Sequence, residues 1–443
     1  MSKRRTGEVT PPRTEPSKDQ TRNTQERTPI MKIAKQLGLA AAALAMLAGP
    51  ALAMDFYHDK ANWEDAFTQV LSKAKDSVGV DVKATPYADT STYQAAVRAS
   101  LRTPSAPGIF TWWSGYRMKD LVDAGLVSDV SALWKKYTDA GLYSPSLASA
   151  YTFDGKIYGI PDLVAYWVVF YNKKVFKDQG LDVPKTWADV EAMAAKLKGA
   201  GITPFGATVD GRWPSFIWFQ EFLVREDPDF YAKLMTGQAK YTDPQVTAAF
   251  KTWADWIGKG YFTDPSITFG TAGGNALAGQ FAQGKVATIL VGTWYDSTLV
   301  QAGMSNDDIG AFIMPNEKAD MANAVIFETG PLLIAANSSQ KDDAMKVADY
   351  WMSAPAQQTW VDAQDFPPVN KDVKAKSPLI ADLVKQINDG KYNQINRFWE
   401  ATPPEIAEAA VDELGNFMLH PETAAQVQQN LQAIADKYWS AHK

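Results

Sequence analysis

Aromatic and charged side chains gather just after the segments of this sequence that are predicted to be β-strands. In open α/β sheets, ligands bind in the crevice beyond the carboxyl ends of the strands, so residues at these positions are candidates for binding. Four strands deliver such residues: Trp112, Trp113 and Ser114 follow the strand from Ile109, Asp210, Arg212 and Trp213 follow 202–207, Trp294 and Tyr295 follow 286–291, and Glu328 follows 324–327. We expect these side chains to lie close together.

This mixture of flat rings and charged groups is suited to binding a sugar. A pyranose presents apolar C–H faces, which favour aromatic surfaces, and a rim of hydroxyl groups, which favours Asp, Glu, Arg and Asn side chains. Each charge-assisted hydrogen bond contributes roughly 1.5–3 kcal/mol. A few such bonds with two or three stacked rings reach micromolar affinity, about −8 kcal/mol.

The alternative role for these rings is core packing, because most tryptophans are largely buried. The chain holds 15 tryptophans. Trp63, Trp256 and Trp351 fall within helical apolar periodicity, so we expect them in the core. Trp113 and Trp294 follow strands instead, and for them binding is the favoured interpretation.

Short β-rich runs alternate with helix-period segments along the chain after residue 53, which predicts an α/β protein with parallel strands. A first strand is expected to end with residues 56–58, a second is expected near 82–84 and a third over 109–112. The apolar run 166–171 is suited to a buried central strand. A helix is expected after Thr186, which with Asp189 forms a capping box. The last helix is expected over 422–439.

The amino end has the layout of a secretory signal peptide. Lys32 and Lys35 precede an apolar run over 37–47, and Gly49-Pro50 and a small-x-small site at 51–53 follow. We therefore expect a signal peptide over 31–53, with a buried amphipathic helix as the less favoured alternative, and a mature chain that starts at Met54. Residues 1–30 are polar and Pro-rich, and are expected to be disordered or untranslated.

Composition narrows the class of protein. There is no cysteine, so the mature chain has neither disulfides nor a lipid-attachment site, and no stable membrane anchor is expected. Residues 1–53 hold nine Lys/Arg and four Asp/Glu, so their removal changes the net charge from −6 to −11. An acidic surface argues against binding nucleic acid or anionic membranes. About 390 mature residues suffice for two lobes.

Several blocks of the sequence resemble the extracellular solute-binding protein family 1, the sugar-binding proteins of ABC importers that include maltose-binding protein. The blocks are DGKIYGIP at 154–161, YWVVFYNKKVFKDQGLDVPKTWADVEAMAAKLKGAGI at 166–202, FAQGKVATILVGTWY at 281–295, ETGPLLIAANSSQKDDAMKVADYW at 328–351 and NRFWEA at 396–401. The order strand-YNK-x-x-F-x-x-x-G-L-x-x-P-x-T-W is specific to that family.

The resemblance implies an α/β, two-lobed periplasmic-binding-protein fold (type II), with the ligand in a cleft between lobes joined by three hinge crossovers. The crossovers are expected near 161–163, 290–291 and 329–330. The N-terminal lobe would combine 54–162 with 291–329, and the C-terminal lobe 163–290 with 330–443. The implied protein is a monomer in the periplasm that uses no cofactor or metal. It closes on a carbohydrate, an oligosaccharide or glycoside, and delivers it to ABC transporter permease subunits.

The resemblance also implies roles for individual residues. Trp112, Trp294 and Trp399 resemble the sugar-stacking rings of the family, and Asp59 and Lys60 resemble its early polar contacts. The loop from Asp210 to Trp213 often faces ligand. One departure is Ala165, where maltose-binding protein has a carboxylate. We expect neighbouring Tyr166 to take over part of that surface, and the preferred sugar to differ.

Two other functions stay open. A receptor for another polar solute, such as a polyamine or glycerol phosphate, would need more convergent carboxylates or more Arg and Lys. A secreted glycosidase would need two carboxylates, for which Asp210 and Glu328 are candidates. Only three histidines occur, His58, His420 and His442, and no phosphate loop or nucleophile elbow is found, so the sequence favours a receptor over an enzyme.

Overall fold

The computed structural model describes residues 53–87, 90–270 and 274–442. The expected extension at 1–30 and all of the expected signal peptide except Ala53 lie outside the described residues. Within the described ranges, none of the helices combines the length and the apolar character needed to cross a membrane.

One mixed sheet runs through the protein in the order β2-β1-β3-β10-β6-β8-β7, with β11 paired to β10 and β9 paired to β6. Its strands are β1 (Met54–His58), β2 (Val82–Pro86), β3 (Ile109–Thr111), β6 (Gly159–Asn172), β7 (Thr203–Gly206), β8 (Val286–Gly292), β9 (Ile309–Phe312), β10 (Ala324–Ile334) and β11 (Asn393–Asn396). β1 pairs in parallel with β2 and β3, as the alternating sequence pattern predicts. Residues 166–170 are buried in the central strand β6, as predicted.

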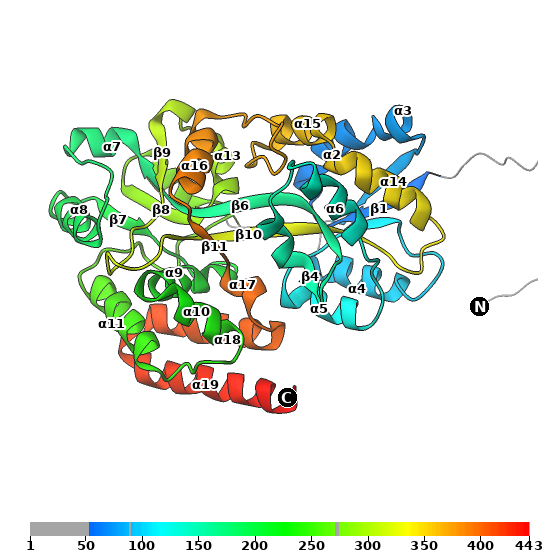
Figure 1. Cartoon of the computed structure of the whole chain (residues 1–443). Coiled ribbons are helices and arrows are strands. Elements are labelled where there is room, and N and C mark those ends of the chain that lie inside the picture. The colour runs from blue at the N-terminus through cyan, green and yellow to red at the C-terminus, as the bar shows by residue number, and fades with distance from the viewer. Residues whose placement is uncertain (1–52, 88–89, 271–273, 443) are drawn as a thin grey trace, which may run out of the picture. The chain divides into compact units, whose positions relative to one another are not determined.

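The long strands β6 and β10 connect two parts of the sheet (Figure 1). They pair antiparallel from Phe327 opposite Tyr166 to Leu333 opposite Gly159. The end of β10 also pairs with β3, whereas the second half of β6 pairs with β8 and β9. Both strands therefore pass from one lobe into the other.

Helices cover each part of the sheet and bury its apolar side chains. Beside β1–β3 lie α2 (Glu64–Leu71), α3 (Ala74–Val78), α4 (Thr90–Ser100), α5 (Tyr116–Asp123), α6 (Ser131–Asp139), α14 (Lys341–Met352) and α15 (Ala354–Gln364). With β7–β9 and β11 lie α7 (Lys173–Asp178), α8 (Trp187–Gly199), α9 (Phe216–Glu226), α10 (Pro228–Met235), α11 (Pro244–Gly258), α12 (Ala276–Ala282), α13 (Asp296–Gln301), α16 (Pro378–Asp389), α17 (Phe398–Ala401), α18 (Pro404–Leu419) and α19 (Ala424–Ala441). The predicted capping box at Thr186 is confirmed at the start of α8. Trp256 and Trp351 are buried in the core, as predicted.

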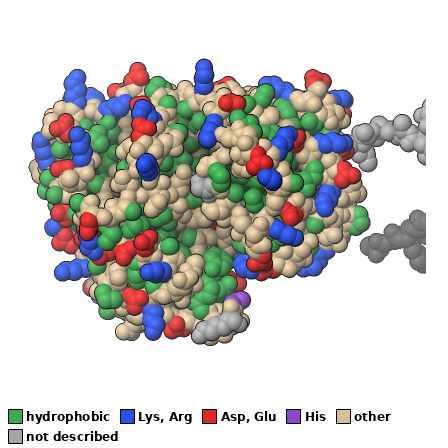
Figure 2. Space-filling model, in the orientation of Figure 1, with side chains coloured by type: hydrophobic (Ala, Val, Ile, Leu, Met, Phe, Trp, Pro, Cys, Tyr) green, Lys and Arg blue, Asp and Glu red, His purple; other side chains and the backbone are tan. Residues whose placement is uncertain are grey.

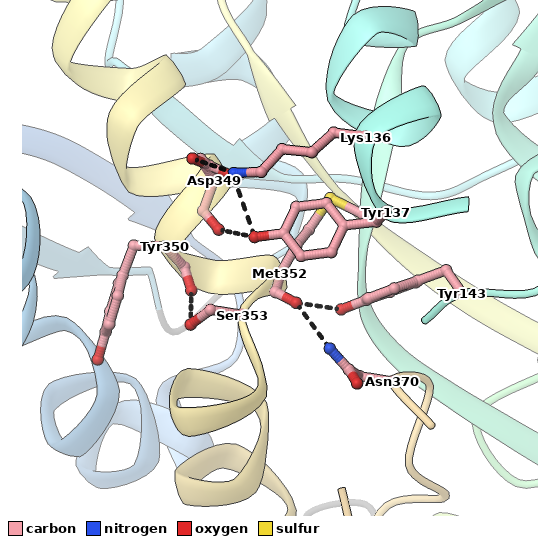
Figure 3. Close-up of polar contacts among 8 residues, drawn as sticks. All are labelled: Lys136, Tyr137, Tyr143, Asp349, Tyr350, Met352, Ser353 and Asn370. Atoms are coloured by element: carbon pink, nitrogen blue, oxygen red, sulfur yellow. Dashed lines mark hydrogen bonds and ion pairs between the residues drawn. The ribbon is translucent and has the colours of Figure 1, made fainter. Parts of the chain in front are cut away.

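Polar contacts fix α14 beside α6 (Figure 3). The Nζ of Lys136 lies 2.6 Å from Asp349 Oδ1, and the hydroxyl of Tyr137 donates to the Asp349 carbonyl at 2.7 Å. The hydroxyl of Tyr143 and the amide of Asn370 both donate to the carbonyl of Met352, at 3.0 and 3.1 Å. These contacts anchor α14 and the segment after α15 to the part of the sheet that holds β1.

The strand pairing differs from the division into lobes that the sequence predicted. Val291 lies inside β8, opposite Val168 of β6, and is not a crossover. α14 contacts α3 and α15 contacts α2, whereas α16 contacts β9. We therefore propose that the described residues of 54–162 and 331–364 form the first lobe and those of 164–327 and 378–442 the second. The third crossover is then the segment 365–377.

Candidate functional site

A cavity of about 490 Å³ lies where β6 and β10 cross between the lobes. Its lining residues are Asp59, Lys60, Trp63, Gln94, Trp113, Arg117, Leu163, Trp213, Phe216, Trp294, Glu328, Arg397, Trp399 and Glu408. The residues up to Arg117 belong to the first lobe, Leu163 and Glu328 lie on the two crossing strands, and the others belong to the second lobe. A ligand in this cavity contacts both lobes.

Tryptophan and phenylalanine rings form the walls of the cavity. Trp213 begins the short helix η3 (Trp213–Ser215) and packs near Trp294, with ring centroids 6.2 Å apart. The ring of Trp399 is stacked on Phe216 at 5.7 Å. On the first lobe, the Nζ of Lys60 lies 5.4 Å from the ring centroid of Trp113 and 5.7 Å from that of Trp63. The five tryptophan rings are only partly buried, so they offer apolar surface to a ligand, whereas the Phe216 ring is buried.

Glu328 lies at the floor of the cavity in a buried network of charges. Its carboxylate accepts a hydrogen bond from the indole N–H of Trp294 and forms an ion pair with Arg397. Arg397 also pairs with Glu400, at 2.5 Å from Nε and 2.6 Å from Nη2. Burial raises the pKa of the Glu328 carboxyl, and the charge of Arg397 opposes this rise. The network joins β10 to the segment before α17 and orients the Trp294 ring.

Asp59 and Lys60 directly follow β1 and carry the polar groups of the first lobe. Asp59 Oδ1 accepts a hydrogen bond from the hydroxyl of Thr111 at 3.1 Å and lies 3.2 Å from the Nζ of Lys60. The Asp59 side chain is 4 % exposed, whereas that of Lys60 is 24 % exposed. The Lys60 ammonium, a donor, is therefore more accessible than the Asp59 carboxylate, an acceptor.

A second carboxyl group, that of Asp162, lies in the crossing strand β6 beside the cavity. It is buried, and among the described residues no side chain forms a hydrogen bond or ion pair with it. Burial raises its pKa to about 7, while Lys60 opposes this rise and Asp59 adds to it. The hinge between the lobes thus contains a carboxyl group that takes up a proton near neutral pH.

Seven of the residues predicted as binding residues line the cavity together. They are Asp59, Lys60, Trp113, Trp213, Trp294, Glu328 and Trp399. They come from both lobes and from β10. Trp113, Trp213 and Trp294 follow strands as expected, whereas Glu328 was expected to follow a strand and lies within β10, opposite Ala165.

Four predicted residues lie outside the cavity lining. Trp112 is 3 % exposed and donates its indole N–H to the carbonyl of Arg117 at 2.8 Å, so it supports Trp113 from the core. Tyr166 is buried in β6, where burial raises its pKa to about 12. Asp210 accepts a hydrogen bond from the backbone N–H of Phe269 at 2.7 Å, and Arg212 pairs with Asp412 at 2.8 Å. Asp210 and Glu328 therefore do not line one cavity.

Seven lining residues were not predicted: Trp63, Gln94, Arg117, Leu163, Phe216, Arg397 and Glu408. Trp63 was expected in the core, but it is only partly buried because it ends the short helix η1 (Ala61–Trp63) next to Lys60. Arg397 precedes Trp399 in a recognised block, so its charge beside a predicted ring was a usable signal. No local pattern marks Arg117 or Glu408.

The fold defines a class of protein: a two-lobed α/β protein with a cavity at the strands that connect its lobes. The model of the family "Bacterial extracellular solute-binding protein" matches residues 62–387, and the chain belongs to this family. The predicted family and fold class are thereby confirmed.

Relatives and solved structures agree with this assignment. The chain is 22 % identical over 374 residues to the ABC transporter extracellular-binding protein PH1214 of Pyrococcus horikoshii, covering 82 % of each chain. It is 22 % identical over 340 residues to the alpha-glucosides-binding periplasmic protein AglE of Rhizobium meliloti, covering 71 % of this chain and 72 % of AglE. The structure of the bacterial solute receptor AcbH superimposes with a TM-score of 0.75 at 24 % identity, covering 87 % of this chain and 98 % of AcbH.

Proposed function

We propose that this protein is the solute-binding component of an ABC importer and that its ligand is a neutral carbohydrate. The observation that carries the proposal is the cavity at the crossing strands, in which five tryptophans surround paired polar groups. Flat rings match the C–H faces of a pyranose, and the paired charges offer fixed donors and acceptors to its hydroxyl groups.

The balance of charge supports a neutral ligand. The lining holds three cations, Lys60, Arg117 and Arg397, and three carboxylates, Asp59, Glu328 and Glu408. Each cation is paired with one of these carboxylates. A polyamine needs surplus carboxylates and a phosphate ester needs surplus cations, because a buried charge is costly without a partner. On the face drawn in Figure 2, Lys and Arg side chains are likewise interspersed with Asp and Glu side chains.

The names of relatives support a carbohydrate ligand as well. Besides AglE, the chain is 28 % identical over 213 residues to the diacetylchitobiose binding protein DasA of Streptomyces coelicolor, covering 45 % of this chain and 46 % of DasA. A chitin oligosaccharide binding protein superimposes with a TM-score of 0.74 at 20 % identity, covering 88 % of this chain and all of that chain.

Transport follows from closure of the lobes on the sugar. A ligand that contacts both lobes favours the closed form, because the open form makes only part of these contacts. Changing the population from 1 % to 99 % closed requires about 5.5 kcal/mol of differential binding. We propose that the segment 31–53 directs the chain to the periplasm, where it acts as a monomer, and that membrane permease subunits bind the closed form.

The test is thermal unfolding of residues 54–443 with mono- and oligosaccharides, spermidine and glycerol 3-phosphate. A true ligand stabilises the protein by mass action, by about 2.7 kcal/mol at a concentration of 100 times Kd. We expect at least one neutral sugar to raise the thermal midpoint. Spermidine and glycerol 3-phosphate should leave the midpoint unchanged. A rise only with the charged solutes would overturn the carbohydrate proposal.

The same samples distinguish between a receptor and a glycosidase as the function of this protein. A hydrolase holds two carboxyl groups on either side of the scissile bond. Here both oxygens of Glu328 are engaged by Trp294 and Arg397, and Asp210 does not line the cavity. We expect the bound sugar to be recovered unchanged by chromatography, and release of a shorter sugar would establish an enzyme instead.

A further inference from the structure

An ion pair connects the two lobes at the rim of the cavity. The Nη2 of Arg117, on α5 of the first lobe, lies 2.8 Å from Oε1 of Glu408, on α18 of the second lobe. The side chain of Arg117 is 11 % exposed and that of Glu408 is 46 % exposed, so the pair spans from the cavity to solvent. We name these two residues the cross-cleft pair.

The guanidinium of Arg117 also occupies space over a stacking ring. Its Cζ lies 4.3 Å from the ring centroid of Trp399. The same indole is stacked on Phe216, so Arg117 and Phe216 each cover part of its surface. A sugar ring at this end of the cavity would have to displace the guanidinium from Trp399, and with it break the contact to Glu408.

Backbone segments of the two lobes also come into close contact at this end of the cavity. Gly115, directly before α5, has a φ of +60°, and a Cβ at this position would overlap the carbonyl oxygen of Glu400 in α17. A separate cavity of about 440 Å³ is lined by Gly115, Tyr116, Tyr231 and Glu400 among others. Gly115 and Glu400 line only this second cavity, whereas the cross-cleft pair lines only the first.

We propose that the cross-cleft pair determines specificity for ligand length by ending the sugar cavity at Trp399, so that the protein selects a neutral mono- or disaccharide. This inference rests on the proposed function. The volume of about 490 Å³ agrees with it, because it lies in the lower half of the range of about 300–1,000 Å³ for small-molecule sites. A longer chain would have to pass the position that Arg117 and Glu408 occupy.

The experiment measures Kd by titration calorimetry for sugars of increasing length. The probes are glucose and galactose, maltose and cellobiose, and the tri- and tetrasaccharides of the maltose and cellobiose series. For the parent we expect binding of at least one mono- or disaccharide and at least about tenfold weaker binding of every trisaccharide and tetrasaccharide.

Three variants test whether the cross-cleft pair causes this preference for short sugars. Glu408→Gln removes the cross-cleft charge while leaving Arg117 over Trp399, and we expect it to reduce the penalty for longer sugars by about tenfold. The variant Glu408→Asp keeps a negative charge opposite Arg117 and should keep the preference for short sugars. Lys135→Gln is the control, because Lys135 pairs with Asp139 within α6 at 2.7 Å and lines neither of the two cavities. It should leave the length profile unchanged.

The outcomes separate the two proposals. If the parent binds no sugar of any length, the carbohydrate proposal fails. If the parent binds tetrasaccharides as tightly as disaccharides, or if Glu408→Gln keeps the parent profile with an unchanged thermal midpoint, the role of the cross-cleft pair is overturned while the carbohydrate proposal stands.

Discussion

The carboxylate of Asp162 occupies the space that a side chain at residue 330 would need. A Cβ built on Gly330 would overlap Asp162 Oδ1. The two residues lie on the neighbouring strands β6 and β10, where the pairing is irregular between Gly330 and Pro331. The acidic group and the glycine are therefore one structural unit of the hinge.

Gly330→Ala should destabilise the protein by about 1–3 kcal/mol, because the new methyl group overpacks the hinge against Asp162. Urea unfolding of the variant and the parent measures this difference. Gly199→Ala is a matched control, because a Cβ at this exposed end of α8 meets no atom within 4 Å. It should leave stability unchanged or raise it by up to about 1 kcal/mol. Equal stability of Gly330→Ala and the parent would contradict the packing described for the hinge.

Asp162 should make stability depend on pH. Its pKa is raised from 3.8 to about 7 in the folded protein. Between these two pKa values, the folded state holds a proton that the unfolded state has released. The stability that this proton contributes is therefore lost as pH rises from about 4 to about 7. Asp162→Asn keeps the shape without the charge. We expect it to gain stability over the parent across this range, on the order of 4 kcal/mol above pH 7.

Unfolding by urea at pH 4.5 and at pH 8 tests this prediction, because these two pH values lie below and above the Asp162 pKa of about 7. Asp296, whose pKa is raised to about 6, also lowers the stability of the parent as pH rises. The decisive quantity is therefore the difference between Asp162→Asn and the parent. A difference that is the same at both pH values would show that Asp162 does not take up the proton.

Truncation of the neighbours Trp112 and Trp113 should affect different properties, stability for Trp112 and sugar affinity for Trp113. Trp112→Ala removes a core side chain and should cost roughly 3–5 kcal/mol of stability. Trp113→Ala and Trp294→Ala expose no such cavity in the core, and should weaken sugar binding by at least about tenfold with little change in thermal midpoint. Thermal unfolding and titration with the sugar identified by screening measure both effects. Unchanged affinity in both Trp113→Ala and Trp294→Ala would show that these rings do not contact the ligand.

Arg397→Met should unfold more easily at neutral pH, because it leaves Glu328 and Glu400 buried without their cation. The expected cost is about 3–5 kcal/mol. Burial raises the pKa of the Glu328 carboxyl, and the variant loses the charge of Arg397 that opposes this rise, so the deficit should shrink as pH falls and Glu328 takes up a proton. Lys135→Met is the control, since its pair with Asp139 is exposed on α6 and contributes little. A deficit that does not change with pH would mean that the network is not held by charge.

Local patterns were sufficient to predict the elements that position the site. The apolar run that forms β6 and the capping box of Thr186 and Asp189 involve residues close in sequence, so propensity and periodicity identify them. The same is true of the strand ends that carry Trp113 and Trp294, whereas Glu328 lies inside β10 because this strand continues to Ile334. Trp112 could have been assigned to the core, because alternation along a strand places it on the face of Phe110, whose ring lies 6.0 Å away.

Other features depend on contacts that no local pattern records. The assignment of α14 to the first lobe depends on β10 pairing with β3 and on the contacts of Asp349 with Lys136 and Tyr137. Arg117 and Glu408 are 291 residues apart in sequence and meet only after both lobes have formed. The division into lobes and the rim of the cavity therefore required the three-dimensional structure.

The paired strands β6 and β10 have a mechanical consequence. Two of the three connections between the lobes are hydrogen-bonded to each other, so a change of angle between the lobes must twist this ribbon as an elastic element. Pro331 has no N–H to donate, and the pairing shifts beside it, so the ribbon is most compliant there. We therefore expect the lobes to turn about a point next to Asp162, where the pairing of the ribbon is weakest.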